Sequence, residues 1–333
     1  MPARSPCGCP RPSLSNHPSG VYKTTMKALI TGSSGQIGTN LSIALMARGD
    51  TVDGIDIRPN AWTREIPTRI LDLTKVRPDE ISTSKDYDVV VHLAAHAKVY
   101  ELVEHPDRAL ANIIDCFTAL DFARTRGIPF IFGSSREVYG DIHHHVTEEK
   151  AADFVVAESP YSASKIAGEA MIYSYGSCYD LPYLVFRFSN VYGRYDNDLD
   201  RMERVIPLFV RKIARDEPIT VFGREKVLDF TYVDDCVGGI IRGIDALTRG
   251  QVKNQTINLA YGSGSSLVDL VNIISLALGK SPRVTYEPAR PGEVTRYVAD
   301  IGKARQLLGY DPQTPLSGGL PKAIAWYKQT GMI

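Results

Sequence analysis

The stretch TGSSGQIG at residues 31–38 decides the fold. It lies between a short apolar run, KALIT (27–31), and a segment with helical spacing, NLSIALMARG (40–49). Its three glycines are Gly32, Gly35 and Gly38. Glycines spaced in this way between a strand and a helix let the backbone turn tightly and approach a pyrophosphate. The stretch therefore predicts a dinucleotide site inside a strand–helix–strand unit.

Amides and carboxylates around this turn predict which dinucleotide binds. The amides of Gln36 and Ile37 open the helix, where a phosphate would lie. Asp56 ends the next strand-like run, TVDGID (51–56), near the offset of an acid that accepts hydrogen bonds from the adenosine ribose. Its charge would repel a 2′-phosphate, so we predict NAD as the cofactor. Arg58 points toward NADP instead, and we interpret it as a solvated loop arginine.

Strand-like and helix-like segments alternate through the first half of the chain. The expected strands are 27–31, 51–56, 68–73, 87–95, 128–135 and 182–190, and the expected helices are 106–126 and 160–179. This alternation predicts an α/β protein with a doubly wound parallel sheet covered on both faces. Asp72 and Leu73 end the third strand, where they could contact the adenine; a turn aspartate is the equal alternative.

The pattern loosens after residue 190. We expect helices at 204–217, 233–247 and 265–279 and a strand at 218–223, with Pro and Gly in the rest. We therefore predict a dinucleotide-binding domain over 26–190. Residues 191–333 would be a smaller substrate domain, interleaved with late strands of the sheet. Asp234 and Asp235 are interpreted as the N-cap of the second of these helices.

Residues 1–25 are rich in Pro, Ser and Arg and have no apolar run, so we expect a disordered tail. Met26 directly precedes the first strand, and a functional chain can begin there.

Composition excludes several function classes. Lys plus Arg equals Asp plus Glu at 38 each in 333 residues, so nothing indicates nucleic acid or a membrane as a partner. Five scattered cysteines favour reduced thiols in a cytoplasm. The consecutive histidines 143–145 cannot converge on one ion, so we expect no metal site.

Three residues predict the chemistry. Tyr161 and Lys165 are four positions apart, so they share one face of a helix. A lysine cation and a bound nicotinamide would lower the pKa of the phenol from about 10. Ser135, at the end of a central strand, can hydrogen-bond the same substrate oxygen. This set suits alcohol–ketone chemistry, in which Tyr161 moves the proton and NAD the hydride.

At this point the chain resembles the extended short-chain dehydrogenase/reductases, in their nucleotide-sugar epimerase, dehydratase and decarboxylase branch. The motifs that carry the resemblance are TGSSGQIG, VVHLAAHAKV, SSREVYG, YSASKIAGE, RFSNVYG, DFTYVDD and ARPGE. The resemblance implies a Rossmann-type domain that retains NAD, a UDP-sugar substrate, and a homodimer. The dimer would form a four-helix bundle from helices 106–126 and 160–179.

The resemblance also implies roles for single residues. Ser135, Tyr161 and Lys165 match the catalytic set, Ala94 lies in a cofactor motif, and Asn112 matches a polar residue of the central helix. For substrate phosphates, the matching residues are Asn190 and Arg290. One departure is Leu228, where many epimerases have a phosphate-binding arginine. That contact is either missing or supplied by Arg224, Arg187 or Arg296.

Arg136 and Glu137 narrow the reaction. Relatives that dehydrate a 4-keto sugar carry Asp and Glu there, and a guanidinium cannot donate the required proton, so dehydration is disfavoured. Uronate decarboxylases also carry the Glu, so Glu137 keeps decarboxylation as a rival reaction. The alternative is that Arg136 is solvated and Glu137 only hydrogen-bonds its loop.

The leading hypothesis is a 4-epimerase of UDP-sugars. Arg194, beyond the strand that ends at Asn190, is expected to hold a C6 carboxylate, and Arg136 could support it from behind the direct contact. We therefore predict UDP-glucuronate and UDP-galacturonate as the favoured pair and UDP-glucose with UDP-galactose next. A UDP-glucuronate decarboxylase and a non-catalytic NAD-binding sensor are the alternatives.

Overall fold

A computed structural model of the chain describes residues 25–82, 84, 86–140, 157–196, 204–289 and 295–333. Its largest element is a seven-stranded sheet in the order β10-β6-β5-β4-β1-β2-β3. Every pair of neighbours in it is parallel. The strands are β1 (Lys27–Thr31), β2 (Thr51–Asp56), β3 (Thr68–Ile70), β4 (Val89–His92), β5 (Phe130–Ser135), β6 (Tyr183–Phe188) and β10 (Gln255–Leu259). The predicted doubly wound parallel sheet is confirmed.

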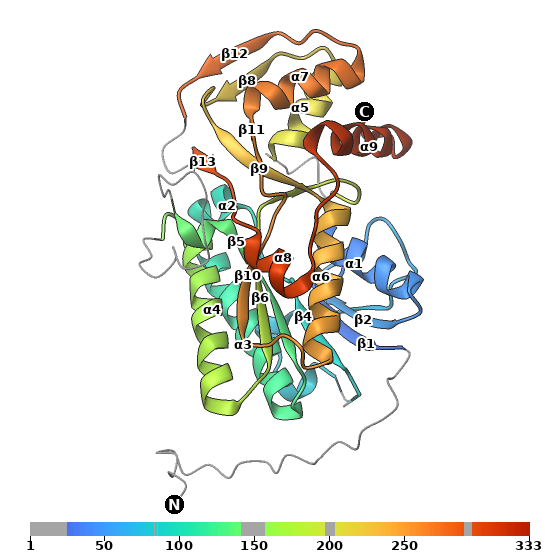
Figure 1. Cartoon of the computed structure of the whole chain (residues 1–333), viewed down its shortest axis with the longest axis vertical. Helices are drawn as coiled ribbons and strands as arrows, with labels where there is room; N and C mark the ends of the chain where they lie inside the picture. Colours follow the sequence, from blue (N-terminus) through green and yellow to red (C-terminus); the bar gives the residue numbers. More distant parts are fainter. Residues whose placement is uncertain (1–24, 83, 85, 141–156, 197–203, 290–294) are drawn as a thin grey trace, which may run out of the picture.

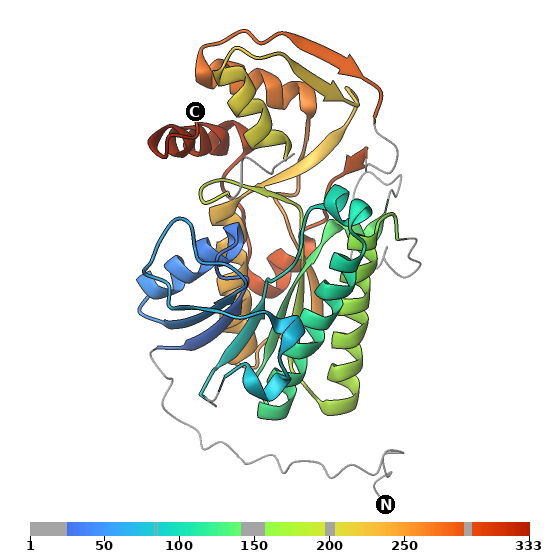
Figure 2. The ribbon, with the colours of Figure 1, turned by 180° about the vertical axis from the view of Figure 1, so that it is seen from behind.

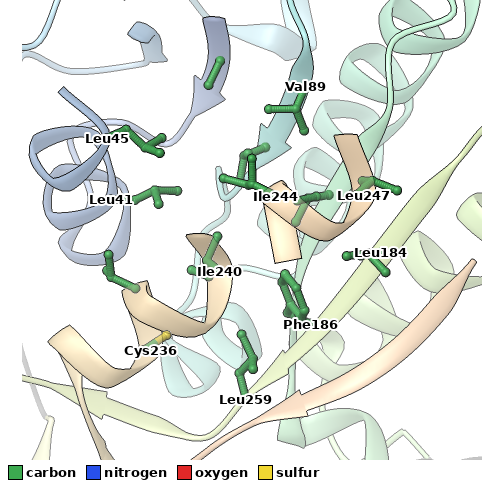
Figure 3. Close-up of a cluster of buried hydrophobic side chains, with 14 of the residues drawn as sticks. Leu41, Leu45, Val89, Leu184, Phe186, Cys236, Ile240, Ile244, Leu247 and Leu259 are labelled. Carbon is green, nitrogen blue, oxygen red and sulfur yellow. The ribbon is translucent and has the colours of Figure 1, made fainter. Parts of the chain in front are cut away.

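Helices cover both faces of this sheet (Figures 1 and 2). One face carries α1 (Gln36–Ala47), α6 (Val233–Thr248) and α8 (Gly302–Leu308), and the other carries α3 (Asp107–Arg126) and α4 (Pro160–Tyr179). A short helix, α2 (Val99–Glu104), precedes α3. Figure 3 shows Leu41 and Leu45 of α1 and Ile240 and Ile244 of α6 meeting the sheet side chains Val89, Leu184 and Phe186. This burial of apolar side chains fixes the helices that carry the site.

Local signals define the ends of α4. Ser159 precedes it, and its hydroxyl accepts from the Ser162 amide at 3.1 Å. Pro160 is its first residue, where a missing N–H costs nothing. Asp180 follows with a left-handed φ of 53°, which ends the helix. The expected helix 160–179 therefore has the bounds that the structure shows.

A second, smaller lobe lies beyond the carboxyl ends of the large sheet (Figure 1). Its main sheet joins β9 (Val227–Tyr232) to β11 (Gly264–Ser266), β13 (Arg296–Tyr297) and β7 (Asn190–Tyr192), and β8 (Ile219–Phe222) pairs with β12 (Val284–Glu287). Three helices pack with it: α5 (Val205–Ala214), α7 (Leu267–Leu278) and α9 (Leu316–Gln329). Among the helices described, none combines the length and the apolar composition needed to cross a membrane.

Two local expectations need correction, and one strand was missed. The predicted strand 68–73 ends at Ile70, because Asp72 instead caps the short 3-10 helix η1 (Leu73–Lys75). Asp234 and Asp235 do not cap α6; Tyr232 holds the N-cap position, and the two aspartates lie in the first turn. Strand β9 was not expected. The tail 1–24 and the histidines 143–145 lie outside the described residues.

Candidate active site

The glycine turn is shaped for close backbone approach. Gly32 has φ +75°, and a Cβ there would lie 2.6 Å from the Ala94 nitrogen. A Cβ on Gly38 would lie 2.1 Å from the Gly32 oxygen. Gly35 is the N-cap of α1 and offers no side chain to its first amides, those of Gln36 and Ile37. An uncapped helix N-terminus behind a glycine turn fits a pyrophosphate group.

The Asp56 carboxylate lies beside the same turn. Oδ2 accepts from the Ser34 amide at 3.0 Å and Oδ1 from the Arg58 amide at 3.2 Å. Burial raises the pKa of Asp56, and these hydrogen bonds act in the opposite direction. The side chain is thus fixed at the end of β2, in a position that suits a ribose hydroxyl.

Asp72 behaves locally as a turn aspartate. It accepts from the Thr74 amide at 3.0 Å and the Thr74 hydroxyl at 2.6 Å, and it pairs with Lys75 at 2.9 Å. These hydrogen bonds from Thr74 and Lys75 lower its pKa. Leu73 beside it is buried. A contact of either residue with adenine stays a prediction.

Ser135, Tyr161 and Lys165 come together at the end of β5. Tyr161 is 7% exposed and Lys165 5%. Burial raises the pKa of Tyr161 to about 12, while a hydrogen bond with Ser135 lowers it, and the Arg204 and Arg136 charges lower it further. The Ser135 hydroxyl also accepts from the Glu137 amide at 3.2 Å.

Lys165 lies near the Tyr161 ring, and its ammonium is hydrogen-bonded to the backbone. Its Nζ donates to the Gly133 carbonyl oxygen at 2.8 Å and lies 5.8 Å from the centre of the Tyr161 ring. Burial lowers the pKa of Lys165 to about 8. The expected lowering of the Tyr161 pKa by Lys165 is therefore not a property of the chain alone, in which burial has the larger effect.

A buried ion pair supports this arrangement from behind. Glu169, one turn beyond Lys165, pairs with Arg187 at 2.6 Å, and both side chains are 5% exposed. Glu169 also accepts from the Ser134 hydroxyl at 2.6 Å. Arg187 is therefore buried in an ion pair with Glu169, so we do not expect it to bind the phosphate in place of the arginine that many epimerases have at the position of Leu228. Leu228 itself is 8% exposed and packs in the core of the small lobe.

Arg136 and Glu137 face each other inside the site. Nη2 of Arg136 lies 2.9 Å from Oε1 of Glu137, with the side chains 13% and 14% exposed. The guanidinium also stands over the Tyr297 ring at 5.5 Å. Its Nη1 is buried and has no hydrogen-bond acceptor among the described residues. The solvated arginine considered from the sequence is thus not what the structure shows.

The remaining predicted residues are placed as follows. Asn112 joins three elements, since it bonds both backbone groups of His96 and the Ser164 hydroxyl. Nδ2 of the Asn190 side chain donates to the backbone carbonyl of Asp229 at 3.0 Å. Arg194 pairs with Asp234 at 2.7 Å, with its side chain 38% exposed. Arg290 lies outside the described residues.

Of the arginines considered for the missing phosphate contact, Arg224 and Arg296 remain. The Arg224 guanidinium stands 5.0 Å from the Tyr286 ring, and Arg296 is an exposed residue of β13. Sequence reasoning missed Arg204, whose charge acts on Tyr161 and whose Nη1 contacts Gln36. No local signal marks it, because Gln36 is 168 positions away.

Known proteins resemble this chain over most of its length. Residues 28–260 match the model of the NAD dependent epimerase/dehydratase family. UDP-glucuronate 4-epimerase 1 of Arabidopsis thaliana is 30% identical over 333 aligned residues, which cover 91% of this chain and 76% of that protein.

Solved structures resemble it as well. The Thermotoga maritima UDP-glucose 4-epimerase with UDP-glucose superposes with a TM-score of 0.84 at 27% identity, covering 92% of this chain and 99% of that one. The Bacillus cereus UDP-glucuronic acid 4-epimerase, in complex with UDP-glucuronic acid and NAD, gives a TM-score of 0.82 at 27% identity, covering 92% and 100%.

Proposed function

Because the chain belongs to the NAD dependent epimerase/dehydratase family, we propose that it is an NAD-dependent 4-epimerase of a UDP-sugar. The observation that carries the proposal is the convergence of Ser135, Tyr161 and Lys165 beside a glycine turn that fits a pyrophosphate. UDP-glucuronate and UDP-galacturonate are the favoured pair, and UDP-glucose with UDP-galactose comes next.

The residues proposed to hold NAD lie along the carboxyl ends of the sheet strands. They are Gly32, Gly35, Gln36, Ile37, Gly38, Asp56, Asp72, Leu73, Ala94, Tyr161 and Lys165. NAD, when bound, would accept hydride from C4 of the sugar and return it to the opposite face. Residues 26–190 would form most of this site, and residues 191–333 most of the sugar-nucleotide site.

The side chains of the protein would transfer the proton. Tyr161 takes the proton of the 4-hydroxyl and later returns one to the ketone oxygen. Ser135 hydrogen-bonds the same oxygen and already contacts the phenol. The positive charge of Lys165, close to the ring, stabilises the phenolate. The buried positions of Tyr161 and Lys165 would help to exclude water from the 4-keto sugar.

Two arginines can bind a uronate carboxylate. Arg194 is engaged by Asp234 in an exposed pair. Arg136 lies within the site, beside Ser135, and has a buried Nη1 with no acceptor in the described chain. A carboxylate would satisfy that donor and could be bound in two-point fashion. Arg136 is thus our first candidate and Arg194 the second, with Asn190 and Arg290 proposed for the phosphates.

Decarboxylation is the alternative that one observation favours, because Glu137 lies in the site. The Glu137 carboxylate pairs with Arg136, and the Glu137 backbone amide donates to the Ser135 hydroxyl. These contacts oppose a role of Glu137 in proton transfer. A non-catalytic NAD sensor has no such observation in its favour.

Product analysis tests the proposal. The purified protein is incubated separately with UDP-glucuronate and UDP-glucose, and the products are resolved by chromatography. We expect UDP-galacturonate with little pentose from the first. A yield of mainly UDP-xylose would identify a decarboxylase instead. No change in either sugar would contradict catalysis.

The chain is also proposed to be a homodimer. Leu110, Ile114 and Phe117 are 58%, 36% and 44% exposed and lie four and three residues apart, in one stripe on α3. A partner α3 and α4 would cover this stripe in a four-helix bundle. Phe117→Asp should convert dimer to monomer in light scattering. Leu276→Asp, on the exposed side of α7, is the matched control and should leave the dimer intact.

A cytoplasmic location is proposed from the thiols. Cys116, Cys178 and Cys236 are all free cysteines. Reduced thiols of this kind suit a reducing compartment.

A further inference from the structure

Arg204 joins the small lobe to the glycine turn. It directly precedes α5, and its Nη1 donates to Gln36 Oε1 at 3.0 Å and to Asp196 Oδ1 at 3.1 Å. Gln36 is the first residue of α1, in the turn proposed to bind the pyrophosphate. One guanidinium nitrogen therefore connects the cofactor turn with the chain that follows β7.

The same chain segment is held by α1 a second time. Nε2 of Gln36 donates to the Gly193 carbonyl at 3.2 Å, and Nδ2 of Asn40 donates to the Arg194 carbonyl at 3.2 Å. Both amide side chains are buried. Segment 193–196 therefore lies directly against the start of the helix that closes the cofactor turn. It is continuous with β7, which begins at Asn190.

The buried carboxylate of Asp196 stabilises the contact that Arg204 makes with it. Asp196 is 1% exposed, and its Oδ2 has no hydrogen-bond partner among the described residues. Burial raises the pKa of Asp196, and the Arg204 charge opposes that effect. A buried carboxylate is strongly destabilising once its cation is removed. The contacts of Arg204 with Asp196 and Gln36 should therefore form and break together.

We propose that Arg204 is a positioning residue that couples retention of NAD to occupancy of the UDP-sugar site. The coupling rests on the proposed NAD and UDP-sugar sites. A nucleotide bound beside Asn190 orders the chain that leads from β7 to Asp196, and Arg204 transmits that order to Gln36. Because such coupling is reciprocal, each ligand then binds more tightly in the presence of the other.

The test measures release of NAD from the holoenzyme, with and without UDP as the probe. Holoenzyme is diluted, passed over a desalting column at intervals, and its remaining NAD is quantified after denaturation. UDP should slow release from the wild type. Arg204→Met should release NAD about tenfold faster in the presence of UDP, within the usual range of coupling. Arg215→Met, an exposed residue that ends α5, is the matched control and should behave as wild type.

A double-mutant cycle separates this role from a purely structural one. The effects of Gln36→Met and Arg204→Met on NAD release should sum to more than the effect of the double variant, because both changes remove the contact between these two side chains. Asp196→Asn combined with Arg204→Met removes the unpaired charge, so it should restore the melting temperature without restoring slow release of NAD.

Two results would overturn the coupling: wild-type NAD release in Arg204→Met, or fully independent effects of the Gln36 and Arg204 changes. Neither readout involves turnover. Failure of the coupling is therefore distinguishable from failure of the proposed epimerase activity, which the product assay measures.

Discussion

The ammonium of Lys165 lies 5.8 Å from the centre of the Tyr161 ring, one turn further along α4. It is anchored there by the Gly133 carbonyl, to which it donates at 2.8 Å. Both side chains are buried, and burial disfavours the charge that each needs in the reaction: a cation on Lys165 and an anion on Tyr161. In the chain alone, burial therefore opposes both the cation on Lys165 and the anion on Tyr161.

Tyr161→Phe should abolish most of the turnover while the protein keeps NAD. Proton transfer by a positioned group contributes about 10²–10⁴-fold, and hydride transfer here depends on it. Turnover and bound NAD are measured on the same preparation. Tyr179→Phe, an exposed residue at the end of the same helix, is the control and should be fully active. Turnover within a few-fold of wild type would rule out Tyr161 as the base.

Lys165→Met should lose activity but gain stability at neutral pH. Burial lowers the pKa of Lys165 from its ordinary value of 10.5 to about 8, so between these values the unfolded chain binds more protons than the folded one. Burial of the charged Lys165 therefore lowers the stability of the wild type by the full amount below about pH 8, and this loss of stability disappears as the pH rises toward about 10. The melting temperature of NAD-free protein should rise in the variant at pH 7, and this gain should shrink at pH 10. A variant less stable than wild type at pH 7 would contradict the assignment.

Asp56→Ala should weaken the preference for NAD over NADP. The Asp56 carboxylate is fixed by the Ser34 and Arg58 amides, where it would repel a 2′-phosphate. We expect the ratio of the two affinities to change about tenfold, or ~1.4 kcal/mol. Asp53→Ala is the control on the same strand, because Asp53 instead contacts Tyr87 and Lys27. A wild type that already prefers NADP would show the assignment to be wrong.

Arg136→Met should change what becomes of a uronate. Oxidation at C4 makes a β-keto acid, in which the C5–C6 bond can break; its electron pair enters the ketone, carbon dioxide leaves, and C5 takes a proton. Without Arg136 the carboxylate is unheld and Glu137 is released. The resulting UDP-4-ketopentose would take back at C4 the hydride that the bound NAD had accepted. UDP-pentose should then appear from UDP-glucuronate, while UDP-glucose turnover falls much less. Arg194→Ala is measured in the same assays. If a variant loses turnover of UDP-glucuronate and of UDP-glucose equally, the arginine it replaces has no role in binding the carboxylate.

Much of the fold could be predicted because its signals are local. Helix α4 begins and ends where Ser159, Pro160 and Asp180 indicate. Strand β9 was missed because its partners come from residues 264–266 and 296–297, far along the chain. Helix α9 contains glycines that suggest a loop, but a Cβ on Gly319 would lie 2.1 Å from the Tyr192 hydroxyl, so that glycine serves close packing.

The site divides in the same way. Ser135, Tyr161 and Lys165 stand in short motifs, and the structure brings them together. The engagement of Arg194 by Asp234, the pair of Arg136 with Glu137, and the contact of Arg204 with Gln36 depend on side-chain geometry that no spacing reveals. The sequence favoured Arg194 for the carboxylate; the contacts lead us to propose Arg136 first, and the role of either arginine stays a prediction.

The position of β10 at the edge of the large sheet has a consequence for folding during synthesis on the ribosome. Its residues Gln255–Leu259 pair with β6, although β7, α5, β8 and β9 of the small lobe come between them in the chain. The nascent chain can thus finish its cofactor-binding layer only after residue 259 has emerged, and α8 still has to follow. A chain that ended at residue 190 would lack β10 and would leave the outer edge of β6 without a partner strand. The two lobes therefore cannot be separated by a single cut at that point.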